Sequence, residues 1–434
     1  MKRIIFLLLP ILFISCSKEE DPKPSFSTQS YTAEIGDLIT LKGNNLGSVT
    51  SVNIFSEEYN VPGFIIVEES RGTYKQPSFT GQTETEIQFI LPEVYADSYI
   101  IRVGDQDLQL NIKGFIPMKN DLDFERERLT GVKVIDENKA LVTADRTLYL
   151  LENGYHDKKL ISREVHFFDV LENGDSWYAR SSDAEFYEIY YNAAGSPSYN
   201  LLTNFNRRDL NDHGGYFYPY NIFITPEKQI FISSGNGTFV IQNNEIMNVI
   251  NIYPGLEAYT PEEREIYSFR LTPAGTVYGQ LSYGNGYLNL NPMDNTFEFS
   301  EEFSSDVRGP IFRDNIGYLF LPWENRFYKS IDSGLTWIES STLTPNTGEE
   351  LRGAEMNVID SNTVLLFLHT SKDSSFPYTT AYITRDGGNN WQEKKRFNAP
   401  RQIELSVHES DLNKHGGLIF FWKFTSYQLY KYVR

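Results

Sequence analysis

The chain has 434 residues, enough for more than one domain and for a large hydrophobic core. Aromatic residues make up 15% of it, with 28 Tyr and 30 Phe, and this abundance of strand-forming side chains predicts an all-β protein. The formal net charge of -19 argues against nucleic acid and anionic lipid as partners held by charge, because their phosphates need a basic footprint.

The first fifteen residues predict a secretory signal peptide. A basic start precedes an apolar run over residues 4–14, which is too short to span a membrane comfortably. The run ends at Ser15-Cys16, and a small residue before a cysteine at this place resembles a bacterial lipobox, although Phe13 stands where a Leu is usual. Cys16 is the single cysteine of the chain, so no internal disulfide is expected. The resemblance implies cleavage before Cys16 and lipidation of its thiol.

The residues that follow Cys16 predict where the protein is sent. Ser17-Lys18-Glu19-Glu20-Asp21 resembles the acidic export signal of Bacteroidetes surface lipoproteins, which implies a lipid anchor in the outer membrane and a protein facing the cell exterior. The expected domains are a signal peptide (1–15), an acidic tether (16–24), a first folded domain (25–114) and a second folded domain (115–434).

The first folded domain shows strand patterns at short intervals and no helical period. The expected strands cover 30–33, 38–42, 49–55, 86–91, 98–103 and 108–112. Apolar residues alternate cleanly in 86–91 and mark one buried face. The apolar residues in 38–41 do not alternate clearly, so the sequence does not indicate which face of this strand is buried. Six or seven strands in about ninety residues fit an immunoglobulin-like sandwich.

Two stretches of this domain are distinctive, Gly-Asp-Leu-Ile-Thr-Leu-Lys-Gly-Asn-Asn-Leu-Gly at 36–47 and Thr-Glu-Ile-Gln-Phe-Ile-Leu-Pro at 85–92. Both resemble the IPT/TIG family. The resemblance implies a spacer or a binding module. Segment 57–82 departs from the family pattern and predicts an extended loop or an extra hairpin.

The second folded domain repeats an apolar strand, a turn and a second strand. The repeats cover 134–142, 170–178, 224–232, 271–278, 312–320, 358–366 and 407–421. Their mean spacing of about 45 residues is that of a four-stranded propeller blade, and such sheets must stack to bury both faces. The sequence therefore predicts a β-propeller with seven blades, and six or eight blades are the alternatives. A strand at 114–118 is expected to complete the last blade.

Two turns of this domain carry a hydroxyl residue, an Asp, a Gly and a Trp at the same spacing. Asp accepts backbone N–H bonds and Gly tolerates positive φ, so each predicts a hairpin turn, with the Trp starting the return strand and packing over the turn. The residues are Ser330, Asp332, Gly334 and Trp337 in one turn, and Thr384, Asp386, Gly388 and Trp391 in the other. This pattern resembles the Asp-box, or BNR repeat, of sialidases and other β-propellers, and the resemblance implies a structural role.

Motifs for catalysis or for metal binding are missing from the sequence. It contains no Gly-x-Ser-x-Gly, P-loop or His-Glu-x-x-His, and we expect no catalytic residue, metal or cofactor. A sialidase would need three arginines to clamp a carboxylate, together with a Tyr nucleophile, a Glu and an Asp acid. The nearest likeness to that family's Phe-Arg-Ile-Pro stretch is Phe312-Arg313-Asp314-Asn315, and no arginine triad can be assigned.

Loops rich in aromatic residues and arginine are the expected binding surface. Aromatic faces with polar rims suit sugars and peptides, although each aromatic side chain can equally pack between blades. The candidate ligand-binding residues are Arg207, Arg208, Tyr216, Tyr218 and Trp323.

The expected function is non-catalytic binding of an extracellular glycan or protein, with outer-membrane lipid as the second partner. The alternatives are a sialidase-like glycoside hydrolase and an assembly or scaffold factor that binds partner proteins, a group that some Asp-box propellers resemble. Arginines gathered at the centre of the propeller would favour the enzyme, an aromatic platform would favour a glycan, and an exposed apolar patch would favour a protein partner.

Overall fold

The computed structural model describes residues 23–55, 74–92, 98–118, 128–182, 186–206, 219–234, 237–242, 245–250, 266–273, 277–281, 287–291, 296–300, 308–343, 349–372, 378–397, 406–414, 416–423 and 426–434. These residues form strands and two short 3-10 turns, η1 (Leu46–Ser48) and η5 (Pro322–Glu324), without an α-helix, so the predicted all-β class is confirmed. No helical segment among them has the length and hydropathy to cross a bilayer. The signal peptide and Cys16 lie outside the described residues.

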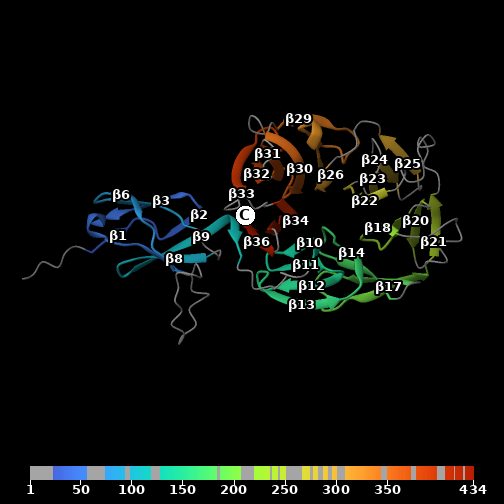
Figure 1. The fold of residues 1–434 in the computed structure, drawn as a ribbon, viewed down its shortest axis with the longest axis horizontal. Coiled ribbons are helices and arrows are strands. Elements are labelled where there is room, and N and C mark those ends of the chain that lie inside the picture. The colour runs from blue at the N-terminus through green and yellow to red at the C-terminus, as the bar shows by residue number, and fades with distance from the viewer. Residues whose placement is uncertain are drawn as a thin grey trace, which may run out of the picture. The chain divides into compact units, whose positions relative to one another are not determined.

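The chain divides into two compact units, Met1–Lys113 and Gly114–Arg434. Unit 1 contains two sheets (Figure 1). In one sheet the strand order is β1 (Ser25–Phe26), β3 (Leu38–Asn44), β7 (Glu86–Ile90) and β6 (Phe79–Gln82). In the other it is β9 (Gln106–Pro117), β8 (Ser98–Val103), β4 (Asn53–Phe55) and β5 (Tyr74–Lys75), and β2 (Ser30–Glu34) pairs parallel to β9.

Each sheet of unit 1 has one buried face, because alternate side chains along a strand point to the same side. On β3 this alternation buries Ile39 and Leu41 and leaves Leu38 53% exposed. The buried face of this strand, which the sequence did not determine, is therefore the one that carries Ile39 and Leu41. All six expected strands overlap observed ones, although 49–55 shortens to β4. Part of segment 57–82 lies outside the described residues, and its end forms β5 and β6.

Unit 2 consists of antiparallel sheets whose strands follow one another in chain order. We number them as sheets 1 to 7. Sheet 1 contains β10 (Leu129–Asp136), β11 (Lys139–Ala144), β12 (Thr147–Glu152) and β13 (Asp157–Ser162), sheet 2 contains β14 (Val165–Val170), β15 (Ser176–Ser181), β16 (Phe186–Asn192) and β17 (Asn200–Asn206), and sheet 3 contains β18 (Pro219–Ile224), β19 (Ile230–Ser234), β20 (Gly237–Gln242) and β21 (Glu245–Ile250). Sheet 4 contains β22 (Ile266–Leu271), β23 (Val277–Leu281), β24 (Tyr287–Asn291) and β25 (Thr296–Ser300), and sheet 5 contains β26 (Arg308–Arg313), β27 (Ile316–Leu321), β28 (Arg326–Ser330) and β29 (Ile338–Thr342). Sheet 6 contains β30 (Glu349–Val358), β31 (Val364–Lys372), β32 (Tyr378–Thr384) and β33 (Gln392–Phe397), and sheet 7 contains β34 (Ser406–Asn413), β35 (Gly416–Lys423) and β36 (Ser426–Val433).

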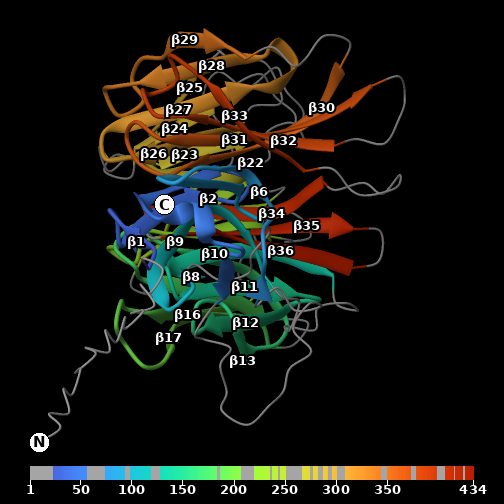
Figure 2. The same ribbon diagram turned by 90° about the vertical axis from the view of Figure 1, so that its left-hand side faces the viewer.

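The seven repeats predicted from the sequence are the first hairpins of these seven sheets. Sheet 7 is completed by the end of β9, because Gly114–Pro117 pair antiparallel with β36, and the Met118 N–H donates to the Leu429 carbonyl at 2.8 Å. The strand expected at 114–118 therefore pairs where it was predicted. Figure 2 shows β34, β35 and β36 side by side.

The first strands of successive sheets contact one another from sheet 1 to sheet 7, and β34 of sheet 7 also contacts β10 of sheet 1. Figure 1 shows these strands toward the middle of unit 2, with β13, β17, β21, β25 and β29 toward its edge. Unit 2 is therefore propeller-like, with several small four-stranded sheets.

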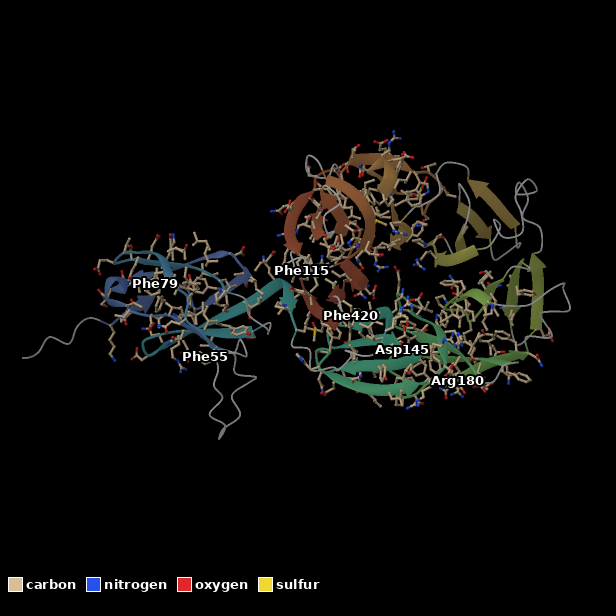
Figure 3. All side chains as sticks on the ribbon, in the orientation of Figure 1. Phe55, Phe79, Phe115, Asp145, Arg180 and Phe420 are labelled. Atoms are coloured by element: carbon tan, nitrogen blue, oxygen red, sulfur yellow. The ribbon has the colours of Figure 1, made fainter. Side chains whose placement is uncertain are left out.

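The core of unit 2 lies between neighbouring sheets. Phe420 on β35 packs in a cluster with Leu129 and Val132 of sheet 1. Phe115, at the end of β9, packs in another cluster with Phe367 and Phe397 of sheet 6. Sheet 7 is thus buried on both faces, and each fully buried side chain of this size stabilises the fold by about 1.5–3 kcal/mol. Phe115 and Phe420 are labelled in Figure 3.

Candidate functional site

The turn between β28 and β29 is held by the side chains of Ser330 and Asp332. The Ser330 Oγ accepts the Gly334 N–H at 2.8 Å and donates to the Asp332 Oδ1 at 2.8 Å. The Asp332 carboxylate also accepts the Thr336 N–H at 2.9 Å and the Thr336 hydroxyl at 2.6 Å. These bonds favour the charged carboxylate, and the Thr336 side chain is the largest cause of the lowered pKa of Asp332.

The turn between β32 and β33 repeats this geometry. The Thr384 Oγ1 accepts the Gly388 N–H at 2.9 Å and donates to the Asp386 Oδ1 at 2.8 Å. The Asp386 carboxylate accepts the Asn390 N–H at 2.9 Å and the Asn390 side-chain amide at 2.7 Å, and these bonds lower the pKa of Asp386 to about 2. Gly388 has φ of +94°. In both turns the carboxylate supports the backbone, which is a structural use.

The two tryptophans directly precede the return strands that they were expected to start, and they contact different neighbours. The return strands begin one residue later, at Ile338 and Gln392. Trp337 packs on Phe312 of its own sheet, with ring centroids 6.1 Å apart. Trp391 of sheet 6 instead meets sheet 5, because its Nε1–H donates to the Ser341 Oγ at 3.0 Å and its ring meets that of Phe327 edge-on at 4.9 Å. The same turn geometry is therefore compatible with different packing partners for the tryptophan.

The five candidate ligand-binding residues stay predictions. Arg207, Arg208, Tyr216 and Tyr218 lie outside the described residues. Trp323 lies in η5, between β27 and β28.

Charged side chains from the first hairpins of four sheets meet in the middle of unit 2. The Lys133 Nζ of β10 pairs with the Asp169 Oδ1 of β14 at 3.1 Å. The Arg313 Nη1 of β26 pairs with the Glu172 Oε1, just after β14, at 3.0 Å, and this pair joins sheet 5 to sheet 2. Asp411 of β34 interacts electrostatically with Lys133, Arg313 and Asp169. We call Lys133, Asp169, Glu172, Arg313 and Asp411 the central charged cluster.

Asp411 is the most perturbed member of this cluster. Burial raises the pKa of its carboxyl, and the nearby Asp169 raises it further. Lys133, Arg313 and a hydrogen bond from the Val134 N–H to Oδ2, at 2.5 Å, act in the opposite direction without reversing the shift. A raised carboxyl pKa in a polar interior is typical of functional sites and also of structural ion-pair networks.

Side chains also bridge the backbones of neighbouring first strands. The Asn413 side-chain amide donates to the Val134 carbonyl at 3.0 Å, so sheet 7 satisfies both backbone groups of Val134. The Asn357 Oδ1 of sheet 6 accepts the Leu412 N–H at 3.0 Å. The Arg308 Nε of sheet 5 donates to the Ala354 carbonyl of sheet 6 at 2.7 Å, so this arginine is engaged outside the central charged cluster.

Sequence reasoning did not select this cluster, apart from naming Arg313 in the likeness to the sialidase stretch. A signal was present in the repeats. Five of the seven first strands carry a polar residue at one repeat position, opposite the same place on the second strand. Taken sheet by sheet, this position holds Lys133, Asp169, Phe223, Arg270, Ile311, Asn357 and Asp411.

A second polar group lies on sheet 2, where Arg180 is labelled in Figure 3. The Arg180 Nε donates to the Glu188 Oε2 at 2.8 Å, and its Nη2 donates to the Tyr190 hydroxyl at 3.1 Å. Tyr190 stacks on Tyr178 at 4.9 Å, and both rings belong to the apolar cluster between sheets 1 and 2. These aromatic side chains pack between sheets, the alternative considered above for every aromatic residue.

A bound metal ion would be another source of chemistry. Across the described residues, no three His, Cys, Asp or Glu side chains are placed to hold a metal ion.

No family model matches this chain, and no curated protein matches it. Solved structures with a partly similar arrangement include three proteins of low sequence identity. YCF48 from Cyanidioschyzon merolae is 12% identical, with a TM-score of 0.47 over 74% of this chain and 98% of that one. Virginiamycin B lyase from Staphylococcus aureus is 11% identical, with a TM-score of 0.46 over 74% of this chain and 99% of that one. The extracellular domain of a putative one-component system from B. thetaiotaomicron is 11% identical, with a TM-score of 0.48 over 82% of this chain and 48% of that one.

Proposed function

We propose that unit 2 is a seven-bladed β-propeller of Asp-box type and that unit 1 is an IPT/TIG-like sandwich that serves as a spacer. The support for the propeller is the contact between the first strands of successive sheets, including β34 with β10, and the pairing of β36 with Gly114–Pro117. The support for the sandwich is the single buried face on each sheet of unit 1.

We propose that this propeller binds an extracellular glycan or protein without catalysis. The observation that carries the proposal is the central charged cluster, in which four sheets contribute cations and anions to one place. A ligand rich in hydroxyl, amide or charged groups can exchange hydrogen bonds with these side chains, whereas an apolar ligand would leave them unsatisfied. The Glu172 side chain is 64% exposed and that of Arg313 is 23% exposed, so this pair lies where a ligand can reach it.

A glycan array and a peptide array, probed with residues 22–434, test this function. Arg313→Gln is expected to weaken binding of the selected ligand by about tenfold or more, because a charged hydrogen-bonding group is lost. The matched control is Arg326→Gln, since Arg326 lies on β28 and pairs with Glu324 and Glu339. Equal binding by wild type, the Arg313 variant and the control would contradict a role for the cluster.

A glycoside hydrolase is the second candidate, and one observation favours it. Asp411 has a raised pKa and lies near the carboxylate of Asp169, and a carboxyl of raised pKa is what the general acid of a glycosidase needs. Against a sialidase, Arg313 is the one arginine that the described residues bring into the cluster. Fluorogenic sialosides and other glycosides distinguish the two functions, because turnover that disappears in Asp411→Asn would establish the enzyme.

The same proposal includes a lipid anchor at Cys16 in the outer membrane, with the protein facing outward. Its support is the apolar run that ends at Ser15-Cys16, followed by acidic residues. Cys16→Ser is expected to move most of the protein from the membrane fraction to the soluble one, because the acyl chains supply the membrane affinity. Fractionation with an immunoblot measures this shift, and Ser15→Ala is the control that keeps the thiol. Unchanged membrane retention of Cys16→Ser would refute the anchor.

A further inference from the structure

The outer strand of sheet 2, β17, is an edge strand. It ends the strand order of its sheet, and among the strands that the structure describes β16 is the one that pairs with it. Figure 1 shows β17 toward the edge of unit 2. An edge strand presents backbone N–H and C=O groups that can pair with another chain, and charged side chains are a usual protection against such pairing.

The other outer strands of unit 2 have a protecting residue. Sheets 1, 3, 4, 5 and 6 carry charged residues there, among them Lys158 on β13, Glu245 on β21, Glu298 on β25, Glu339 on β29 and Lys394 on β33. The outer strand of sheet 7 ends at Pro117, which has no N–H to donate. In contrast, β17 reads Asn-Leu-Leu-Thr-Asn-Phe-Asn and carries no charge.

The backbone of β17 does not set it apart from the other outer strands. A β-bulge also protects an edge, because it bends the strand. β17 has one at Leu202, which is skipped between the pairs that Leu201 and Thr203 form with β16. The outer strands of sheets 1, 3, 5 and 6 have a register shift of the same kind. The missing charge is therefore the feature that distinguishes β17.

The sequence of β17 fits a second copy of the same strand. A two-fold contact needs a surface that complements itself, and an antiparallel pair formed about the centre of one strand meets this condition. β17 has an asparagine at each end, an apolar residue next to each asparagine, and Thr203 in the middle. Pairing about Thr203 sets the apolar bulge of one copy beside Phe205 of the other, and such aromatic and aliphatic pairs stabilise adjacent strands. Leu201, which is 52% exposed, would be covered there.

The net charge of -19 does not prevent this contact. Charges more than about 8 Å apart are largely screened at physiological ionic strength, so the charge that matters lies near the paired strands. Because β17 is uncharged, its pairing with a second β17 sets no like charges opposite each other. A different protein would find no charge on β17 by which it could be selected. The strand therefore favours a second copy of this chain.

We propose that β17 pairs antiparallel with β17 of a second copy, about a two-fold axis at Thr203. The four strands of sheet 2 in each copy then join in one continuous sheet. The strand has 7 residues, against the roughly 20–30 residues a side of a standard interface, so the association is weak and reversible. This pairing is separate from the central charged cluster and does not depend on the function proposed for it.

Disulfide trapping in the full chain tests the pairing. Thr203→Cys places two thiols at the axis, where paired Cα atoms lie about 4.5–5.5 Å apart, within the range that a disulfide accepts. After mild oxidation, a dimer is expected on a non-reducing gel and is expected to disappear on reduction. Wild type, with Cys16 alone, measures the background.

Ser162→Cys is the matched control. Ser162 lies at the same position of β13, is 7% exposed against 6% for Thr203, and both hydroxyls donate to the next carbonyl at 3.4 Å. The dimer yield of Thr203→Cys is expected to exceed that of Ser162→Cys by about tenfold or more, because paired thiols react at a high effective concentration.

A charge on the edge is expected to abolish the pairing. Asn204 is exposed, and Arg163 stands at the equivalent place of sheet 1, so the fold accepts an arginine there. Thr203→Cys combined with Asn204→Arg is expected to lower the dimer yield to that of Ser162→Cys, because two like charges meet close to the axis. A thermal melt checks the fold of this variant. If it fails to fold, Asn200→Lys, which introduces the Lys159 of sheet 1, makes the same comparison.

Other outcomes overturn the proposal. Equal dimer yields from Thr203→Cys and Ser162→Cys would show that copies meet by random collision, and no dimer from Thr203→Cys would exclude the axis. A yield that Asn204→Arg does not change would exclude pairing of the edges. A trapped product with the mass of this chain and a different protein would assign the edge to another partner.

Discussion

Replacing Asp411 with Ala is expected to lower the free energy of unfolding of unit 2 by about 2 kcal/mol, because the buried Val134 N–H loses its acceptor. The same change removes the negative partner that Lys133 and Arg313 share in the centre. For a unit of this size the loss corresponds to a fall in Tm of roughly 3 °C. Calorimetry or circular dichroism measures it, with Glu245→Ala, at an exposed carboxylate on β21, as the control.

Asp411→Asn separates the hydrogen bond from the charge. The amide oxygen can still accept the Val134 N–H, but the group does not titrate. Because the folded pKa of Asp411 is raised, the wild-type carboxyl stabilises the folded state below its unfolded pKa near 3.8 and loses this contribution as pH rises through the folded pKa. The Asn variant is therefore expected to gain stability relative to wild type as pH rises from 4 toward 7. An Asn variant as unstable as Asp411→Ala at pH 7 would contradict the raised pKa as the cause.

Gly388→Ala is expected to destabilise unit 2 by about 3 kcal/mol. Gly388 has φ of +94°, where a side chain costs roughly 1–2 kcal/mol. A Cβ would also lie 2.4 Å from the Phe327 Cε1 and 2.8 Å from the Ser340 Oγ, so sheet 6 would be pushed from sheet 5 at a further cost of about 1–3 kcal/mol. Urea unfolding followed by tryptophan fluorescence measures the change, since Trp391 packs on Phe327 at this interface.

Gly195→Ala is the matched control for Gly388. Its φ of +79° imposes a similar backbone strain, but nothing lies within 4 Å of the added Cβ. It is expected to cost about 1 kcal/mol. Equal losses at the two positions would show that backbone strain alone acts at Gly388 and that the contact between the sheets does not resist the extra atom.

The sequence predicts elements whose causes are local. The hairpins of unit 2 were predictable because apolar alternation and turn residues act over a few positions, as at Val134–Ala140 and Leu271–Val277. The Asp-box turns follow from hydroxyl, carboxylate and glycine chemistry within eight residues. The completing strand at 114–118 was predictable because a blade that lacks a strand leaves an unpaired edge.

The central charged cluster depends on contacts that no local pattern specifies. The Arg313–Glu172 pair joins residues 141 positions apart, and the Asp411–Val134 bond spans 277. An isolated Lys133 or Asp169 reads as an ordinary surface charge until the repeats are aligned. The face of β3 was ambiguous for a similar reason, because packing of the opposite sheet decides between Leu38 and Ile39. The loop candidates from Arg207 to Tyr218 stay untested.

The pairing of Gly114–Pro117 with β36 has a consequence for synthesis. The strand made first in unit 2 finds its neighbour only in residues 426–433, at the far end of the chain. Until residues 426–433 have been synthesised, Gly114–Pro117 offers open N–H and C=O groups to any other strand nearby. The nascent chain must therefore be kept from such pairing until residues 426–433 are available to complete sheet 7.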